Sequence, residues 1–141
     1  MTYYPAILVD TSLLVAYYNA RDSYHTQVQN FLGDSTSRLV TTFGCVTEVM
    51  WLLARDWRVQ NEFLSDLTRS LYECEHLTLE DLARITELNA QYADLPGDFA
   101  DLSLIAVSER LNIAAIATLD KDFDIYRRYR RQSFERVFRP A

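Results

Sequence analysis

The sequence predicts an α/β fold, a three-layer α/β/α arrangement with a mostly parallel central sheet. Short apolar runs such as Ala6–Val9 and Ile113–Ala117 end abruptly in polar residues, as buried strands of parallel sheets do. Segments with apolar residues at helical spacing separate those runs, which is the alternation of βαβ units. Glycine and proline number only three each among 141 residues, too few for a turn-rich sandwich or barrel.

The first part of the chain is expected to form two strands and two helices. The strand over Ala6–Val9 stops at Asp10, and a short helix follows over Leu13–Tyr18. The Asp22-Ser23 pair offers side-chain oxygens that can cap a second helix, and Leu39–Thr42 is the second strand. That second helix carries His25, Val28, Phe31 and Leu32 at helical spacing.

The middle of the chain predicts two further helices and an edge strand. The second of these helices covers Glu62–Leu71, and the edge strand lies around Glu75–Thr78. The first covers Thr47–Ala54, because apolar residues recur there at three- and four-residue steps, at Val46, Val49, Met50 and Leu53.

The last part repeats the alternation of helices and strands. Pro96-Gly97 breaks the chain, Asp98 opens a helix, and Asn112 ends it as a C-terminal cap. Strands are expected over Ile113–Ala117 and Phe134–Phe138. A helix over Glu80–Tyr92 precedes the break, with Leu82, Ile85, Leu88 and Tyr92 on one face. The helix after Asp98 is expected to bury Leu102, Ile105, Ala106 and Leu111.

Composition limits the class of protein. The chain is 49% hydrophobic and 24% charged, so we expect residues 1–141 to form one folded domain. With 14 basic and 20 acidic residues the formal net charge is −6, which argues against binding duplex DNA or an anionic membrane by bulk charge. No apolar run approaches the roughly 20 residues of a membrane span. The start lacks the basic region of a signal peptide, and Cys45 and Cys74 lack metal or redox spacing, so a soluble cytoplasmic protein is expected.

Carboxylates follow the predicted strands, at the edge where parallel α/β sheets place their sites. Glu48, for example, is expected in the first turn of the helix after the second strand. If the sheet is parallel, these side chains meet at one edge. In chain order they are Asp10, Glu48, Asp98, Asp101, Asp120 and Asp122.

Several of these acids also have an ordinary structural explanation. Asp98 and Asp101 have the spacing of a capping box, and the helix dipole favours any acid in a first helical turn. Glu48 could be such a surface residue, and Asp122 a solvated residue at a helix start. Asp10, like Asp120, is harder to explain, because a carboxylate at the end of a buried strand is poorly hydrated and needs a partner.

The joint pattern favours a metal site. Two carboxylates about 5 Å apart repel by roughly 3 kcal/mol at an effective dielectric constant near 20. Several are tolerated together when protons are retained or a divalent cation neutralises them. Lys121 is the only lysine, and no histidine-rich or cysteine-rich set suggests zinc. Oxygen ligands select Mg²⁺ or Mn²⁺, so the residues predict metal-assisted phosphodiester hydrolysis.

The sequence also resembles the PIN domains, the metal-dependent nuclease fold of VapC-type toxins. The resemblance extends over nearly the whole chain and rests on the order and spacing of four segments, none of them specific alone. These segments are Ile7–Ser12, Thr47–Val49, Asp98–Ala106 and Ala117–Phe123. The resemblance implies the catalytic residues Asp10, Glu48, Asp98, Asp101 and Asp120, with Asp10, Glu48, Asp101 and Asp120 as metal ligands.

The resemblance further implies a role for each acid. Asp10 is a direct ligand, with Thr11 or Ser12 closing the turn around it, and Glu48 binds metal or orients a metal-bound water. In the third segment Asp101 ranks above Asp98 as a ligand.

In the fourth segment Asp120 ranks above Asp122, because Asp120 directly follows the strand. Thr118 is placed to hydrogen-bond a ligand carboxylate or a water.

The implied activity is hydrolysis of RNA phosphodiester bonds by in-line attack of metal-activated water, without a covalent enzyme intermediate. PIN-domain toxins commonly act as homodimers and are silenced by a small antitoxin, often of the VapB type. The resemblance therefore implies a Mg²⁺- or Mn²⁺-dependent endoribonuclease that acts as the toxin of a VapBC-type pair. Its partners would be RNA, a VapB-type antitoxin and a second copy of the chain, with no membrane.

Two other functions remain open. The first is a PIN-fold binding module without catalysis, against which the retained acid set counts. The second is an aspartate-based phosphoryl-transfer domain of the receiver or haloacid-dehalogenase type. The dehalogenase pattern needs an aspartate where Ser12 stands, and the receiver pattern needs adjacent N-terminal acids and a late lysine.

Arginines gather near the C-terminus, with Tyr126 and Tyr129 among them. They could position RNA phosphates and bases beside the metal site, or pair with acids elsewhere as part of an ordinary solvated strand. Trp51 and Trp57 are expected to pack in the core or in a dimer face. The arginines are Arg127, Arg128, Arg130, Arg131, Arg136 and Arg139.

Overall fold

Five parallel strands form the central sheet, in the order β3-β2-β1-β4-β7. The computed structural model describes residues 3–95 and 97–140. All four pairings in the sheet are parallel, so the carboxyl ends of the strands share one edge. The strands are β1 (Ala6–Val9), β2 (Arg38–Thr42), β3 (Glu73–Glu75), β4 (Ala115–Ala117) and β7 (Glu135–Phe138).

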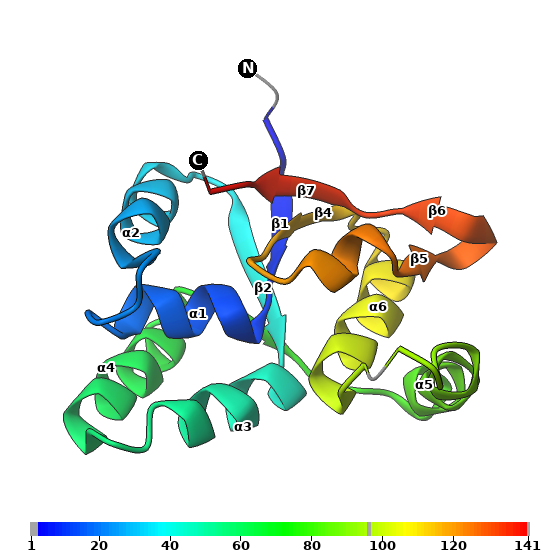
Figure 1. The fold of residues 1–141 in the computed structure, drawn as a ribbon, viewed down its shortest axis with the longest axis horizontal. Coiled ribbons are helices and arrows are strands. Elements are labelled where there is room, and N and C mark those ends of the chain that lie inside the picture. The colour runs from blue at the N-terminus through cyan, green and yellow to red at the C-terminus, as the bar shows by residue number, and fades with distance from the viewer. Residues whose placement is uncertain (1–2, 96, 141) are drawn as a thin grey trace.

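Helices cover both faces of this sheet, as the sequence predicts. Alternate residues of β1 belong to different cores: Ile7 and Val9 pack with α1–α4, and Leu8 packs with α5 and α6. Figure 1 shows the two groups of helices on opposite sides of the strands. The helices are α1 (Thr11–Tyr18), α2 (His25–Asp34), α3 (Phe43–Leu52), α4 (Trp57–Thr68), α5 (Leu79–Gln91) and α6 (Phe99–Leu111).

The chain between β4 and β7 makes an excursion that the sequence analysis did not predict. After the short 3-10 helix η1 (Lys121–Asp124), strands β5 (Arg127–Arg128) and β6 (Gln132–Ser133) pair antiparallel as a hairpin. The hairpin tip is the 3-10 turn η2 (Tyr129–Arg131), and it projects from the body of the molecule beside α6 (Figure 1).

Several predicted boundaries are wrong, each for a local reason. The helix predicted over Glu62–Leu71 begins at Trp57, because the Asp56 side chain accepts a hydrogen bond from the Arg58 amide and caps it there. The helix predicted over Thr47–Ala54 begins at Phe43, directly after β2, and is capped by Thr42. The Asp22-Ser23 pair does not cap α2 directly, because the Asp22 carboxylate accepts from the amide of Tyr24, the residue just before the helix begins.

Strand positions are recovered more closely. The expected strand Ala6–Val9 is confirmed to the residue, and the edge strand lies at Glu73–Glu75, two residues before its expected start. Asn112 ends α6 in the left-handed conformation, as predicted. The predicted break at Pro96 lies outside the described residues.

Two aromatic residues are not in the core. Trp51 and Trp57 are 79% and 60% exposed, so the expectation that they pack in the core is wrong, and their place in a dimer face stays a prediction. Leu82 is also largely exposed on α5. No helix in the described part of the chain is both long and apolar enough to cross a membrane.

Candidate active site

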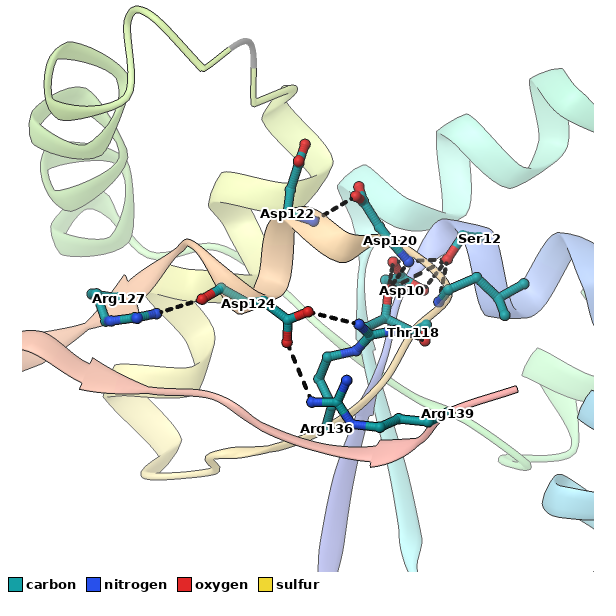
Figure 2. A network of polar contacts seen from close by, with 10 residues as sticks. Asp10, Ser12, Thr118, Asp120, Asp122, Asp124, Arg127, Arg136 and Arg139 are labelled. Atoms are coloured by element: carbon teal, nitrogen blue, oxygen red, sulfur yellow. Dashed lines mark hydrogen bonds and ion pairs between the residues drawn. The ribbon is translucent and has the colours of Figure 1, made fainter. Parts of the chain in front are cut away.

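Asp10 lies at the carboxyl end of β1, where the chain turns into α1. Its Oδ1 atom caps α1 by accepting a hydrogen bond from the Leu13 amide at 3.0 Å. The hydroxyl of Ser12 donates to the same carboxylate at 2.8 Å, and that of Thr118, after β4, donates at 2.5 Å. Figure 2 shows these side chains converging from two strands. The expectations that Ser12 closes the turn and that Thr118 bonds a carboxylate of the site are confirmed.

The Asp10 carboxylate is under strong opposing influences. Burial is the largest and raises its pKa to about 6, with a further contribution from the charge of Asp120. Hydrogen bonds from Thr118, Leu13 and Ser12 lower the pKa but do not cancel the effect of burial. Asp10 is only 2% exposed, so its carboxylate has lost most of its hydration, and the three hydrogen-bond donors hold it in one orientation.

The first turn of α6 supplies two more acids. Asp98 caps the helix by accepting from the Asp101 amide at 2.8 Å, so the ordinary capping explanation for Asp98 is confirmed. The Asp101 side chain accepts instead from the Tyr126 hydroxyl at 3.1 Å. Burial first, and then the charges of Asp98, Asp10 and Asp120, raise the pKa of Asp101 to about 8.

Glu48 reaches the same region from α3. Because α3 begins at Phe43, Glu48 lies in its second turn, and the prediction of a first-turn position is wrong. Burial and the neighbouring Asp98 carboxyl raise the pKa of Glu48, with a smaller contribution from Asp10. The buried hydroxyl of Thr11 makes no hydrogen bond of normal geometry among the described residues, but it lies close enough to Glu48 to lower the pKa of that carboxyl group.

Asp120 and Asp122 complete the group at the start of η1. Asp120 Oδ1 accepts from the Asp122 amide at 2.9 Å, as Figure 2 shows. One carboxylate oxygen each from Asp101, Asp120 and Asp122 lies within 4.8 Å of the others. Burial and the charge of Asp120 raise the pKa of Asp122. The expected position of Asp122 at a helix start is confirmed, and its partly exposed side chain also belongs to the cluster.

The ion pairs among the described residues leave these six acids without a cationic partner. Asp124, the next acid along the chain, shows the contrast, because Arg136 and Arg139 pair with it at 3.1 and 3.3 Å (Figure 2). These six acids, called the acid cluster below, therefore offer only oxygen atoms as ligands, and their mutual repulsion is not offset by a nearby cation. The Thr11 hydroxyl beside them also has no hydrogen bond of normal geometry among the described residues. A hard divalent cation fits this donor set better than zinc or a soft metal does.

Comparison with known proteins identifies the family. The family model for the PIN domain matches residues 7–129, most of the chain. The chain belongs to the PIN domain family. The match contains all six acids and ends at Tyr129, before the arginines of the hairpin tip.

Two relatives of this PIN domain come from Mycobacterium tuberculosis. Ribonuclease VapC26 of strain ATCC 25618 / H37Rv is 26% identical over 117 residues, which covers 82% of this chain and 87% of VapC26. The crystal structure of VapC20, described as a sarcin-ricin loop cleaving toxin, superimposes with a TM-score of 0.78. It is 22% identical and the match covers 84% of this chain and 93% of VapC20, which shows a shared fold.

From the sequence, Asp122 ranks below Asp120, and the contact of Tyr126 with this PIN-domain cluster is not anticipated. The spacing of Asp120 and Asp122 after β4 was the available signal for Asp122. Stacking on bases was one possibility for Tyr126, but its ring is fully buried and its hydroxyl donates to Asp101. Nothing in the local sequence around Tyr126 points to an acid 25 residues away.

Proposed function

We propose that this PIN domain is a Mg²⁺- or Mn²⁺-dependent endoribonuclease that hydrolyses RNA phosphodiester bonds, with residues 1–141 forming a single nuclease domain. The observation that carries the proposal is the convergence of carboxylates from β1, α3, α6 and η1 without a paired cation. The similarity to Ribonuclease VapC26 supports RNA as the substrate class. Membership of the PIN domain family counts against a receiver or dehalogenase domain.

We assign Asp10, Glu48, Asp101 and Asp120 as the metal ligands, with Asp98 as a further catalytic carboxylate. The contact of Asp122 with the cluster supports it as an additional or alternative ligand to Asp120. The hydrogen bonds that orient Asp10 support its assignment, and the carboxylate oxygens of Asp101, Asp120 and Asp122, which lie within 4.8 Å of one another, support a site between α6 and η1.

Each residue then has a definite task. Ser12 and Thr118 hold the Asp10 carboxylate in one orientation, and the Tyr126 hydroxyl does the same for Asp101. Glu48, half-buried beside Asp98, is placed to bind the ion or to orient a water bound to it. A divalent ion, when bound, would supply Lewis-acid activation of water and neutralise charge on the phosphate.

We further propose that the protein is the cytoplasmic toxin of a VapBC-type pair, acts as a homodimer and is silenced by a VapB-type antitoxin. The VapC names of both relatives support this proposal. A cluster of carboxylates without paired cations is also a surface that basic side chains of an inhibitor would bind. Sedimentation of the purified chain, alone and with the product of a neighbouring antitoxin gene, measures both associations.

Replacement of Asp10 tests the activity. Asp10→Asn should reduce Mg²⁺-dependent cleavage of a labelled RNA stem-loop by about 100-fold or more, beyond the 10–100-fold typical of a residue that only supports a ligand. The fold should persist, because the asparagine retains the cap on α1 and relieves repulsion. Asp34→Asn, at an exposed position in α2, is the matched control and should cleave like the wild type.

Two results would reject the activity. Cleavage by Asp10→Asn at the wild-type rate excludes this site as the catalytic centre. A folded wild-type protein that shows neither Mg²⁺- or Mn²⁺-dependent cleavage nor stabilisation by these ions is a non-catalytic PIN module instead.

The toxin role is tested in cells. Expression of the wild type should slow bacterial growth, and expression of Asp10→Asn to the same level should not. Equal growth of the two strains contradicts a toxin that acts through this site.

A further inference from the structure

Four of the six C-terminal arginines are held by the protein itself. Arg128 is buried and donates to a hydroxyl and a carbonyl oxygen of α6 at 3.1 and 2.9 Å. Arg136 and Arg139 pair with Asp124. Arg127 donates to three carbonyl oxygens at the end of η1. These four guanidinium groups are structural, although only Arg136 and Arg139 pair with an acid as the ordinary explanation of the cluster predicts.

Arg130 and Arg131 differ from that group. Both are exposed at the hairpin tip, and neither takes part in the hydrogen bonds or ion pairs found among the described residues. The Arg130 guanidinium lies 5.5 Å from the centre of the Tyr129 ring, which is itself 61% exposed. The tip therefore presents two uncompensated positive charges and an accessible aromatic face on a chain with a net charge of −6.

The backbone of the tip is a poor one for arginine. Arg130 has φ 59° and ψ 31°, Arg131 has φ 62°, and the Gln132 amide donates to the Tyr129 carbonyl. This is the arrangement of a type I′ turn, whose two central positions favour Asn-Gly. Residues with a β-carbon lose free energy in the left-handed region. Because Asn-Gly would close the hairpin with less strain, the stability of the turn does not explain the two arginines.

The tip is also connected to the acid cluster through one short strand. Tyr126, which bonds Asp101, precedes Arg130 by four residues, so their α-carbons are at most about 14 Å apart. The hairpin lies beside α6, and its tip points outward from the molecule, as Figure 1 shows. An RNA strand of several nucleotides that enters the acid cluster is long enough to reach the tip.

We propose that the hairpin tip, Tyr129–Arg131, binds the phosphate backbone of the RNA substrate at a position several nucleotides from the bond that is cleaved. Arg130 and Arg131 contact phosphates, and Tyr129 offers a stacking face to a neighbouring base. The inference rests on the proposed ribonuclease function, since it names how that substrate is held. Phosphates suit the tip better than an acidic protein does, because an aromatic face beside paired arginines matches both parts of a nucleotide.

The test measures RNA binding without cleavage. Fluorescence anisotropy with a labelled RNA stem-loop, in EDTA and over a range of KCl concentrations, gives the affinity and its salt dependence. The double variant Arg130→Asn/Arg131→Gly places the preferred type I′ residues at the tip. It should melt at a higher temperature than the wild type while binding RNA about 10-fold more weakly at moderate salt. The slope of log affinity against log salt should become shallower by about 1.4, the value for two lost contacts to a single strand.

Two control variants separate charge from structure. Arg130→Lys/Arg131→Lys keeps the charges and should keep the wild-type slope. Arg21→Gln/Arg55→Gln removes two exposed arginines elsewhere and should leave the slope unchanged. If the tip variant has the same slope and affinity as this second control, the inference is overturned. An acidic protein would then be the better candidate for the partner of the tip.

Cleavage assays distinguish failure of this inference from failure of the proposed function. Mg²⁺-dependent cleavage by the wild type with no effect of the tip variant on binding rejects the tip alone. A loss of salt slope in the tip variant, in a protein that never cleaves RNA, rejects the nuclease and retains the tip as an RNA contact. A wild type that does not bind the RNA rejects the inference.

Discussion

Tyr126 is the residue that favours the charged form of Asp101. Its hydroxyl donates to the Asp101 carboxylate at 3.1 Å and lowers the pKa that burial and three neighbouring carboxylates raise. The ring is fully buried, and a β-carbon placed on Gly97 would lie 2.6 Å from its hydroxyl oxygen. Gly97 therefore leaves the space in which this hydrogen bond forms.

Tyr126→Phe should move the pH dependence of cleavage upward. Without the donor the pKa of Asp101 rises further above about 8, so a higher pH is needed to supply the deprotonated carboxylate that a cation binds. Stability should change by about 1 kcal/mol at most, the net value of a typical hydrogen bond. A pH–rate profile measures the shift, and Tyr129→Phe, at an exposed tyrosine outside the cluster, should leave the profile in place. An unchanged profile in Tyr126→Phe contradicts the assigned role.

Gly97→Ala should give a shift of the same sign by a different route. The added methyl group displaces the Tyr126 hydroxyl from its position near Asp101. The variant should also be less stable than the wild type by about 1–3 kcal/mol, the usual cost of overpacking. Thermal unfolding and the pH–rate profile measure the two effects, and a profile identical to the wild type would show that the ring does not move.

The acids could be predicted from the sequence to different degrees. Asp10 is apparent because a polar residue that ends an apolar strand has few ordinary explanations, and Asp101 because the helix start after the break is clear. Asp122 was discounted because nothing local distinguishes a solvated acid from a clustered one. Tyr126 could not be assigned, because its partner is brought near only by the folded chain.

The contact between α3 and α6 positions Glu48 beside Asp98. Thr42 caps α3 through the Cys45 amide at 3.3 Å, and its hydroxyl also lies 2.6 Å from that of Ser103 on α6. The helices approach closely, since a β-carbon on Gly44 would lie 3.4 Å from the Ala100 α-carbon. Helix α3 begins four residues before its predicted start, because the glycine after its first residue interrupts the apolar pattern in the sequence.

Thr42→Val should loosen this contact and weaken the metal site. Loss of the cap and of the buried hydrogen bond should lower stability by about 1–2 kcal/mol. Displacement of Glu48 should reduce the rise in melting temperature that Mg²⁺ produces. Thr78→Val removes a comparable cap from α5, away from the acids, and serves as the control. Thr78→Val should lower stability by a similar amount and leave the rise in melting temperature with Mg²⁺ unchanged. If Mg²⁺ raises the melting temperature equally in the two variants, α3 does not position Glu48.

The two cores of the molecule explain why its general architecture could be predicted. Each buried strand carries apolar residues for both faces, so the periodicity of the sequence specifies a sheet covered on both sides. Because the strands are parallel, acids that follow them in the sequence are expected at one edge of the sheet, and no further information is needed for that prediction. The hairpin could not be predicted in the same way, because its strands are two residues each and show no alternation.

The stability of the whole metal-free protein should decrease from about pH 5 to about pH 8. The folded-state pKa values of Asp10 and Asp101, about 6 and about 8, lie above the ordinary value of 3.8. The folded chain therefore binds protons that the unfolded chain has released, and this stabilising effect is lost as the pH rises through those two values. The total is on the order of 5 kcal/mol, which corresponds to roughly 10 °C or more in melting temperature. Mg²⁺ should offset more of the loss at pH 8 than at pH 5, because it binds the deprotonated carboxylates.

Thermal unfolding in EDTA and in Mg²⁺ across this pH range measures both effects. The double variant Asp10→Asn/Asp101→Asn should flatten the metal-free profile and remove most of the stabilisation by Mg²⁺, whereas Asp34→Asn should behave like the wild type. A metal-free wild type whose stability stays level or increases over this range would show that neither burial nor repulsion between the acids raises the pKa of these carboxyl groups in the folded state. The physical basis for a cation at this edge of the sheet would then be gone, because the cluster would need no counter-charge.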